Sequence, residues 1–217
     1  MLTMLEEVVL LAVDENTGRL RSTTRFGTAY ALGGALFFDL ALAKKIDTGT
    51  WSIEVVNDAA DTGNAAMDHF LGEIAKRKDI NSVRGWIEEA FGYKEYLEEE
   101  ALRSLTQRGI LRHEKTKRLW LIDVERFPLV DDKKHLHVKL RLADAILSDT
   151  IPDTRDIMLV ALADACGLLG YILSPSEIAN RRERIRTLRQ LETISREVAE
   201  AIADLDQHIK TAINNVV

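Results

Sequence analysis

The two longest apolar stretches of the chain, residues 29–42 and 157–173, constrain its fold more than any other feature. Each is interrupted by an acidic residue, Asp39 in the first and Asp164 in the second. Neither reaches the ~20 uninterrupted apolar residues that a membrane-spanning helix needs. Over residues 27–44 the apolar side chains recur at mixed three- and four-residue spacing, which is typical of a helix buried on most sides. We therefore expect a soluble protein built around buried helices.

The rest of the chain predicts mainly further helices. Ser82 is a residue type that caps helix N-termini, and Gly109, Pro152 and Pro175 are residue types that end helices. The helices expected from these signals and from the apolar spacing cover residues 65–78, 82–90, 93–108, 133–148, 154–172, 176–190 and 193–215.

Short β-hairpins are expected between these helices. The chain begins with a pattern that favours a short helix over residues 3–7, running directly into an apolar strand over residues 8–13. The three expected hairpins cover residues 8–22, 46–56 and 110–123, the last with its turn at residues 114–117. The sequence thus predicts a mostly α fold, a single helical domain over residues 1–217, with one hairpin projecting near residues 110–123.

Length and charge limit the function classes. The 217 residues suit one domain, and 29 Lys and Arg against 35 Asp and Glu give a formal net charge of −6. This acidic balance argues against broad binding to nucleic acid, although a local basic patch is compatible with it. Cys166 is the only cysteine, so no intrachain disulfide can form, and a reducing, cytoplasmic compartment is favoured.

Candidate catalytic and metal-binding groups are few. Cys166 lies in an apolar helical segment, where a free cysteine is typically a small core residue. His135 and His137 are two residues apart, which places them on opposite sides of a helix instead of at one metal ion. The pair Gly33-Gly34 favours close helix packing over a phosphate-binding loop. The sequence therefore predicts no enzyme, no metal and no cofactor.

The expected hairpin at residues 110–123 carries the clearest candidate binding surface. Lys115, Lys117 and Arg118 stand beside Leu119 and Trp120. A basic tip next to an exposed aromatic side chain is typical of a peripheral membrane contact or of a protein partner surface. Strand alternation alone leaves open whether Trp120 faces outward or packs inward.

A second interpretation is a winged-helix-like DNA-binding regulator, because a helix over residues 93–108 precedes a β wing. The arginine-rich residues 181–189 are either a phosphate-binding face or an ion-paired helix surface. DNA recognition needs cations on the first of these helices. That helix instead carries Glu95, Glu98, Glu99 and Glu100, so no nucleic-acid partner is expected.

Several segments, taken together and in order, resemble the Golgi phosphoprotein 3 family. They lie between residues 2 and 175, and the last forty residues match only loosely. The segments are LTMLEEVVLL at residues 2–11, GALFFDLAL at 34–42, SVRGWIE at 82–88, Gly109-Ile110-Leu111, Glu114-Lys115, Phe127-Pro128-Leu129 and the Leu- and Ala-rich residues 157–173. Because the matching region begins at once, at Leu2-Thr3, the chain looks like a prokaryotic-type member.

The resemblance implies a non-enzymatic protein that recognises phosphatidylinositol 4-phosphate at a membrane surface and acts as an adaptor for membrane enzymes. It also implies that the hairpin serves membrane contact and oligomerisation. Expected partners are therefore an anionic membrane lipid and protein partners or a second copy bound through the hairpin. The expected location is the cytoplasm, peripherally at a membrane.

The family's lipid-binding residues are not matched in this chain. The resemblance places its tryptophan at Thr24, its first arginine near Gly33 and its other two arginines at Glu95 and Glu98. Glutamates at two of these positions replace attraction for a phosphate with repulsion. We therefore expect that the inherited head-group site is not retained, unless cations elsewhere compensate. The candidates are Arg21, Arg25 and Arg103.

Overall fold

The computed structural model describes residues 1–21, 25–48, 52–56, 62–118, 122–194, 196–198 and 200–201, and for residues 25, 48, 116–118 and 122–124 it describes the backbone alone. Within these residues the fold is mostly α. The helices are α1 (Met4–Ala12), α2 (Arg25–Leu42), α3 (Ala65–Lys76), α4 (Val83–Ala90), α5 (Lys94–Gln107), α6 (Lys133–Leu147), α7 (Thr154–Cys166), α8 (Pro175–Asn180) and α9 (Arg182–Leu191). The strands are β1 (Ile46–Thr48), β2 (Ile53–Val55), β3 (Glu114–Arg118) and β4 (Ile122–Arg126).

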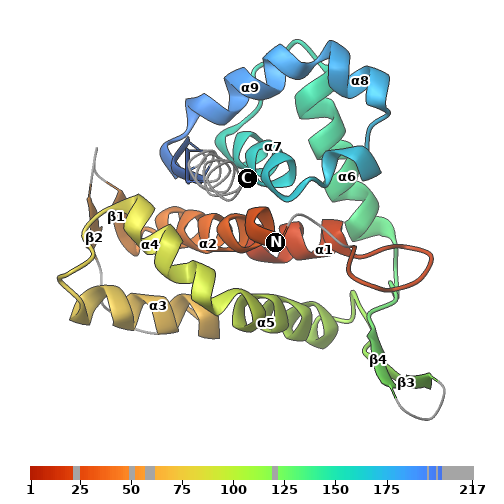
Figure 1. Cartoon of the computed structure of the whole chain (residues 1–217), viewed down its shortest axis with the longest axis horizontal. Helices are drawn as coiled ribbons and strands as arrows, with labels where there is room; N and C mark the ends of the chain where they lie inside the picture. Colours follow the sequence, from red (N-terminus) through yellow and green to blue (C-terminus); the bar gives the residue numbers. More distant parts are fainter. Residues whose placement is uncertain are drawn as a thin grey trace, which may run out of the picture.

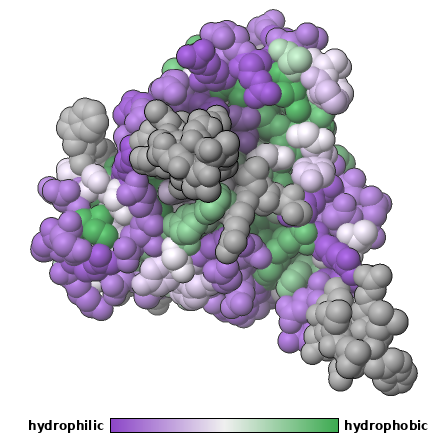
Figure 2. Space-filling view, in the orientation of Figure 1, coloured by the Kyte–Doolittle hydropathy of each residue, from purple (hydrophilic) through white to green (hydrophobic). Residues whose placement is uncertain are grey.

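The helices form three layers (Figure 1). Helices α1 and α2 make the middle layer, with α3, α4 and α5 on one side and α6, α7 and α9 on the other. The β3–β4 hairpin projects away from the helical layers near the end of α5. No helix in the described part of the chain is both long and apolar enough to cross a membrane. Hydrophilic side chains dominate the face shown in Figure 2, notably over α3 and α9.

The middle layer explains the two glycines at the centre of α2. A Cβ atom on Gly33 would lie 2.9 Å from the Cβ atom of Ala90 in α4. A Cβ atom on Gly34 would lie 2.5 Å from Val198 on the opposite side. Residues 27–40 of α2 are all buried. This confirms the prediction of a helix buried on most sides, with the glycine pair allowing neighbours to approach closely.

The prediction of a strand over residues 8–13 is wrong, because α1 runs without a break from Met4 to Ala12. Thr3 and Glu6 form a capping box that starts the helix. The following side chains are buried on every side of the helix. The apolar run therefore has no helical periodicity, and its sequence resembles that of a buried strand. Of the expected first hairpin, the described residues show an isolated bridge between Val13 and Leu20 and no regular strand pair.

The other two hairpins are present, and the last differs in its turn. β1 pairs with β2 as expected. Residues 114–117 are not a turn but belong to β3, where Lys115 lies opposite Glu125 and Lys117 opposite Asp123. Cross-strand pairs of opposite charge stabilise a ladder, so a polar segment that looks like a turn extends the hairpin instead. The residues joining β3 to β4 lie outside the described part of the chain.

The C-terminal helices are shorter than expected. α7 ends at Cys166 because Gly167 adopts a left-handed conformation with φ of 74°, and only a 3₁₀ turn follows over Leu169–Tyr171. The helix expected over residues 176–190 is divided at Arg181 into α8 and α9. Of the helix expected over residues 193–215, the residues described as helical lie between 193 and 201.

Candidate functional site

An open cavity of about 610 Å³ lies between α5 and the base of the β3–β4 hairpin, and we call it the α5–hairpin pocket. It combines three apolar side chains with several charged ones. The lining residues are Leu20, Glu98, Glu99, Leu102, Arg103, Thr106, Gln107, His113, Glu125 and Phe127. The pocket is therefore built from α5, from the base of the hairpin that follows α5, and from Leu20, which is distant from both in the sequence.

The hairpin wall of the pocket is held in place by the loop after α1. The Phe127 N–H donates a hydrogen bond to the Gly18 carbonyl, with an N···O distance of 2.5 Å. Gly18 has φ of 64°, and a Cβ atom there would lie 2.7 Å from the Pro128 nitrogen. His113 stacks on Phe127 with ring centroids 4.9 Å apart and the planes nearly parallel, at 4°. Both side chains line the α5–hairpin pocket.

Carboxylates outnumber cations in the α5–hairpin pocket. Glu98 forms an ion pair with Lys94, 3.1 Å away on the same helix. Glu125 lies 2.9 Å from Lys115, and this hydrogen bond is the main reason that the pKa of Glu125 is lowered. Glu99 is exposed and has no ion pair or hydrogen bond from its side chain within the described residues. The pocket is thus acidic.

The structure does not gather the three candidate compensating cations into one site. Arg103 lines the pocket, but its guanidinium donates two hydrogen bonds to Glu100, which raises the pKa of Arg103. Arg21 is mostly buried outside the pocket lining, 3.3 Å from Asp14, with its guanidinium 4.4 Å from the centre of the Tyr171 ring. The side chain of Arg25 lies outside the described part of the structure.

The positions at which the resemblance places the family's lipid-binding residues are also scattered. Gly33 is buried between α2 and α4, where no surface ligand reaches it. Glu95 is exposed on α5, and Glu98 lines the α5–hairpin pocket. Thr24 lies outside the described residues. An acidic helix face thus occupies the place where that resemblance puts two arginines.

The candidate residues of the hairpin are placed only in part. Lys115 is exposed on β3 and paired with Glu125. Lys117 and Arg118 belong to β3, but their side chains are not described. Leu119 and Trp120 lie outside the described residues, so the direction of Trp120 stays a prediction.

The arginines of residues 181–189 serve mainly as internal contacts. Arg181 donates to the Leu147 carbonyl and Arg184 to the Ala145 carbonyl, which satisfies the C-terminal end of α6. Arg189 forms an ion pair with Asp164 at 2.7 Å. This geometry supports the ion-paired interpretation of the segment and disfavours a phosphate-binding face.

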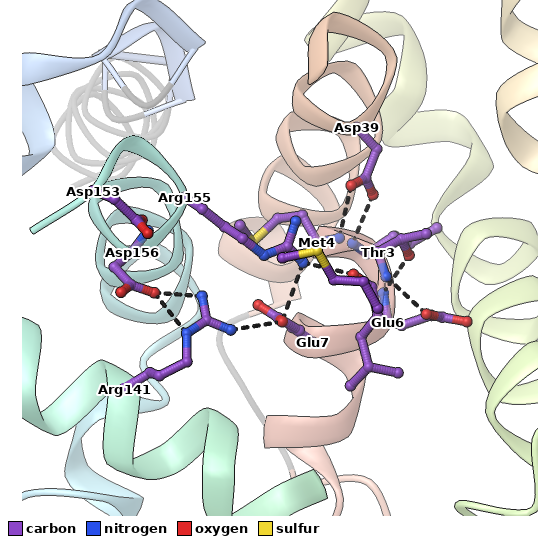
Figure 3. Close-up of polar contacts among 12 residues, drawn as sticks. Thr3, Met4, Glu6, Glu7, Asp39, Arg141, Asp153, Arg155 and Asp156 are labelled. Carbon is purple, nitrogen blue, oxygen red and sulfur yellow. Dashed lines mark hydrogen bonds and ion pairs between the residues drawn. The ribbon is translucent and has the colours of Figure 1, made fainter. Parts of the chain in front are cut away.

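A buried polar cluster at the start of α1 was not predicted (Figure 3). The Asp39 carboxylate accepts hydrogen bonds from the N–H groups of Met4 and Leu5, at 2.8 and 3.1 Å. Burial raises the pKa of Asp39 to about 7, although both hydrogen bonds oppose this shift. Two acids within an apolar run, Glu6 and Glu7, were the signal in the sequence, since buried carboxylates need partners.

Glu6 and Glu7 connect the middle layer to both outer layers. Glu6 accepts hydrogen bonds from Ser104 of α5 and from Arg108, each at 2.6 Å. Glu7 lies 2.8 Å from Arg141 of α6 and 3.1 Å from Arg155 of α7. These two carboxylates therefore hold helices together, which is a structural role.

The remaining candidates for catalytic or metal-binding roles are Cys166, His135 and His137. Cys166 is fully buried, and burial raises the pKa of its thiol to about 12. His135 is buried and His137 is exposed, which confirms that the two face opposite sides of the helix. Within the residues that the structure describes, no three His, Cys, Asp or Glu side chains are grouped as metal ligands.

Comparison with known proteins identifies the family. No curated protein matches the chain. A family model described as Golgi phosphoprotein 3 (GPP34) matches residues 4–205, from the start of α1 to beyond α9. Because this match covers nearly the whole chain, the protein belongs to the Golgi phosphoprotein 3 family.

Proposed function

We propose that the protein is a non-enzymatic adaptor of the cytoplasm that associates peripherally with anionic membranes through the β3–β4 hairpin. The observation that carries the proposal is the projection of this hairpin away from the helical layers (Figure 1). Residues 112–126 contain five Lys or Arg and three Asp or Glu, in a chain that is acidic as a whole. A projecting basic element reaches a membrane without bringing the acidic body against it.

The hairpin is expected to be attracted to an anionic membrane by its Lys and Arg residues and by Leu119 and Trp120. A Lys or Arg near an anionic lipid surface contributes about 1 kcal/mol, although the pairing of Lys115 with Glu125 reduces its share. Trp120 and Leu119 are residue types that enter the membrane interface and add apolar burial. Self-association through the same hairpin is a second use of the surface, and it would appear as a change in mass on membranes or in solution.

Selective recognition of phosphatidylinositol 4-phosphate is not part of the proposal. Glu98 lines the α5–hairpin pocket, Glu95 is exposed nearby on α5, and Glu100 holds the guanidinium of Arg103. A phosphomonoester would meet more carboxylates than free cations there. We expect binding to follow the total anionic charge of the membrane instead of the identity of the head group.

Vesicle sedimentation tests this proposal. Vesicles of phosphatidylcholine alone would be compared with vesicles containing phosphatidylserine or phosphatidylinositol 4-phosphate at equal total charge. We expect binding to both anionic vesicles and at least about tenfold weaker binding by the variant Lys115→Ala/Lys117→Ala/Arg118→Ala. The control Lys44→Ala/Lys76→Ala/Lys78→Ala removes the same charge around β1 and α3, at the opposite end of the molecule from the hairpin.

Two results would contradict the proposal. Absence of binding to every anionic vesicle would exclude the membrane contact. Equal losses in the hairpin variant and the control variant would show that net charge matters and the hairpin does not. A marked preference for phosphatidylinositol 4-phosphate would instead reveal a head-group site despite the acidic pocket.

A further inference from the structure

We infer that the outward face of α6 pairs with the same face of a second copy of the chain, in an antiparallel helix dimer centred on Leu140. This surface is separate from the β3–β4 hairpin and involves no lipid. The inference rests on the exposed leucines of α6, on their spacing and on the distribution of charge along the helix.

The exposed leucines of α6 form an apolar strip. α6 packs on α7 and α1 in the layer shown in Figure 1, and its inward face buries Val138 and Leu142. On the opposite face Leu136 is 49% exposed and Leu140 is 59% exposed. Single exposed leucines are common on protein surfaces, but two on successive turns of one helix form a continuous strip that association removes from water.

The spacing along this face fits a helix as the partner. The residues of the face are Lys133, Leu136, Leu140, Ala143 and Leu147, at alternating intervals of three and four residues. The first three are exposed and the last two are half-buried. Alternating intervals of three and four are typical of the seam between two coiled helices. The face therefore suits a second helix.

The charges select a second copy of α6 in the antiparallel orientation. Lys133, Lys134 and His137 are exposed on the first half of the helix, and Asp144 is exposed on the second half. The Asp144 carboxylate has no ion pair or hydrogen bond within the described residues, whereas Lys133 lies 3.7 Å from Asp131. Parallel pairing would bring like charges together. Antiparallel pairing places the carboxylate of each copy beside the basic half of the other.

A two-fold axis at Leu140 forms these contacts together. Successive residues of a helix are turned by about 100°, so Leu136 and Leu147 lie on one edge of the face and His137 and Asp144 on the other. The two-fold rotation brings the same edges of the two copies together. Leu136 then packs near Leu147 of the other copy, His137 lies near Asp144 of the other copy, and Leu140 meets its own copy. The face is thus self-complementary, as a two-fold dimer requires.

The small size of the face indicates a weak dimer. The 15 residues of α6 span about 22 Å, and one helix pair of this length buries less than the roughly 1,200 Å² of a stable interface. Val130 and Ile151 flank the two ends of α6 and are 59% and 86% exposed. Antiparallel pairing brings these opposite ends of the two copies close together. We expect a dissociation constant on the order of 10–100 μM.

Sedimentation equilibrium of the full chain tests the inference. The native chain should change from monomer to dimer between about 1 and 200 μM. The variant Leu136→Glu/Leu140→Glu should raise the dissociation constant at least about tenfold, because four carboxylates then meet at the seam. The control Leu42→Glu/Leu191→Glu changes leucines of similar exposure, 51% and 57%, at the ends of α2 and α9. It should alter the constant by less than about twofold.

Cysteine crosslinking and a charge exchange test the orientation. Mild oxidation should join Leu140→Cys chains, since residue 140 lies on the two-fold axis, and the native Cys166 is buried and does not compete. Leu136→Cys chains should not be joined, because their cysteines would be separated by about 12 Å along the helix. Asp144→Lys should weaken the dimer, and His137→Asp/Asp144→Lys should restore most of it.

Several results would overturn the inference. They are a monomer mass at every concentration, equal losses in the two double-leucine variants, or equal crosslinking at positions 136 and 140. All variants should melt near the temperature of the native chain, because the substituted side chains are not buried.

The dimer and the membrane contact can fail independently. The variant Lys115→Ala/Lys117→Ala/Arg118→Ala should still dimerise, and a dimer lost in that variant would place self-association at the hairpin instead. The variant Leu136→Glu/Leu140→Glu should keep vesicle binding through the hairpin. If it lost vesicle binding while its mass in solution matched that of the native chain, the α6 face would be a membrane contact and not a dimer surface.

Discussion

At the scale of single residues, the buried Asp39 carboxylate shows how burial and hydrogen bonding oppose each other. Two N–H groups at the start of α1 and the charge of Arg155 favour the ionised form. Burial favours the protonated form more strongly and raises the pKa from 3.8 to about 7. The folded chain therefore holds a proton at Asp39 over a pH range in which the unfolded chain has released it.

This shift predicts a dependence of stability on pH. The raised pKa of Asp39 stabilises the folded chain fully below about pH 4. This stabilisation is lost as the pH rises through about 7. Relative to the variant Asp39→Asn, the native chain should lose up to about 1.4 kcal/mol of unfolding free energy per pH unit between about pH 5 and pH 7. Urea unfolding of both proteins across this range measures the difference, and parallel curves would refute the shifted pKa.

Gly33 and Gly72 predict opposite effects of the same substitution. Gly33→Ala brings a methyl group to 2.9 Å from Ala90, so we expect a loss of about 1–3 kcal/mol despite the better helix propensity of Ala. Gly72→Ala in α3 meets only the Lys76 ammonium at 4.0 Å, so we expect a gain of about 0.5–1 kcal/mol. Thermal unfolding of the two variants measures the difference. Similar changes in their melting temperatures would show that α2 and α4 are not closely packed.

At the scale of elements, the orientation of the β3–β4 hairpin depends in part on the turn at Gly18. Its base is held by the hydrogen bond from Phe127 to Gly18, and by the pairing of Leu111 with Leu129. Gly18 supports the hairpin because its positive φ and the closeness of Pro128 both exclude a side chain. The hairpin is thus positioned by a loop nearly one hundred residues earlier in the chain.

Substituting Gly18 should therefore loosen the hairpin. Gly18→Ala combines the strain of φ at 64° with a contact of 2.7 Å to the Pro128 backbone. Gly63→Ala, with φ of 72° and no atom within 4 Å of the added Cβ, carries the strain alone. We expect the first variant to lose about 1–2 kcal/mol more than the second, with faster amide exchange in β3 and β4. Unchanged exchange would contradict the anchoring role.

At the scale of the whole molecule, the three layers are held by apolar packing and by the ion pairs that cross them. Helix α1 is buried on all sides, and Glu6 accepts a hydrogen bond from Ser104 of α5. Glu7 forms ion pairs with Arg141 of α6 and Arg155 of α7 (Figure 3). A buried carboxylate that loses its cation is more costly than the pair is favourable. The crossing ion pairs therefore penalise arrangements in which the layers slide past each other.

Removing one crossing cation tests this role. Arg108→Met leaves the Glu6 carboxylate buried, with Ser104 and the Thr3 N–H as remaining hydrogen-bond donors. We expect the free energy of unfolding to fall by about 2–3 kcal/mol. This is less than the full cost of a buried carboxylate without its cation, because Arg108 is partly exposed. Urea unfolding should show that Arg108→Met/Glu6→Gln recovers most of the loss. If the double variant were as unstable as the sum of the single ones, the two groups would not be coupled.

Local patterns predicted most of the fold and little of the candidate site. The helix ends at Ser82 and Gly109 depend on capping chemistry within a few residues, and the structure confirms both helices that they bound. The α5–hairpin pocket joins Leu20, α5 and Phe127, whose approach depends on how the layers stack. No spacing in the sequence encodes that approach, so the surroundings of Arg103 could not be predicted.

The sequence by itself determined a mostly helical chain of the Golgi phosphoprotein 3 family, with a hairpin near residue 114 and acids at two positions where the family resemblance places arginines. These features depend on residue identity and on order along the chain. Only the tertiary structure decided that residues 8–12 are helical, that Arg181 and Arg184 bind carbonyls of α6, and that Glu98 lines the same pocket as Phe127. The reason is physical, because burial and ion pairing are set by neighbours that lie many residues away in the sequence.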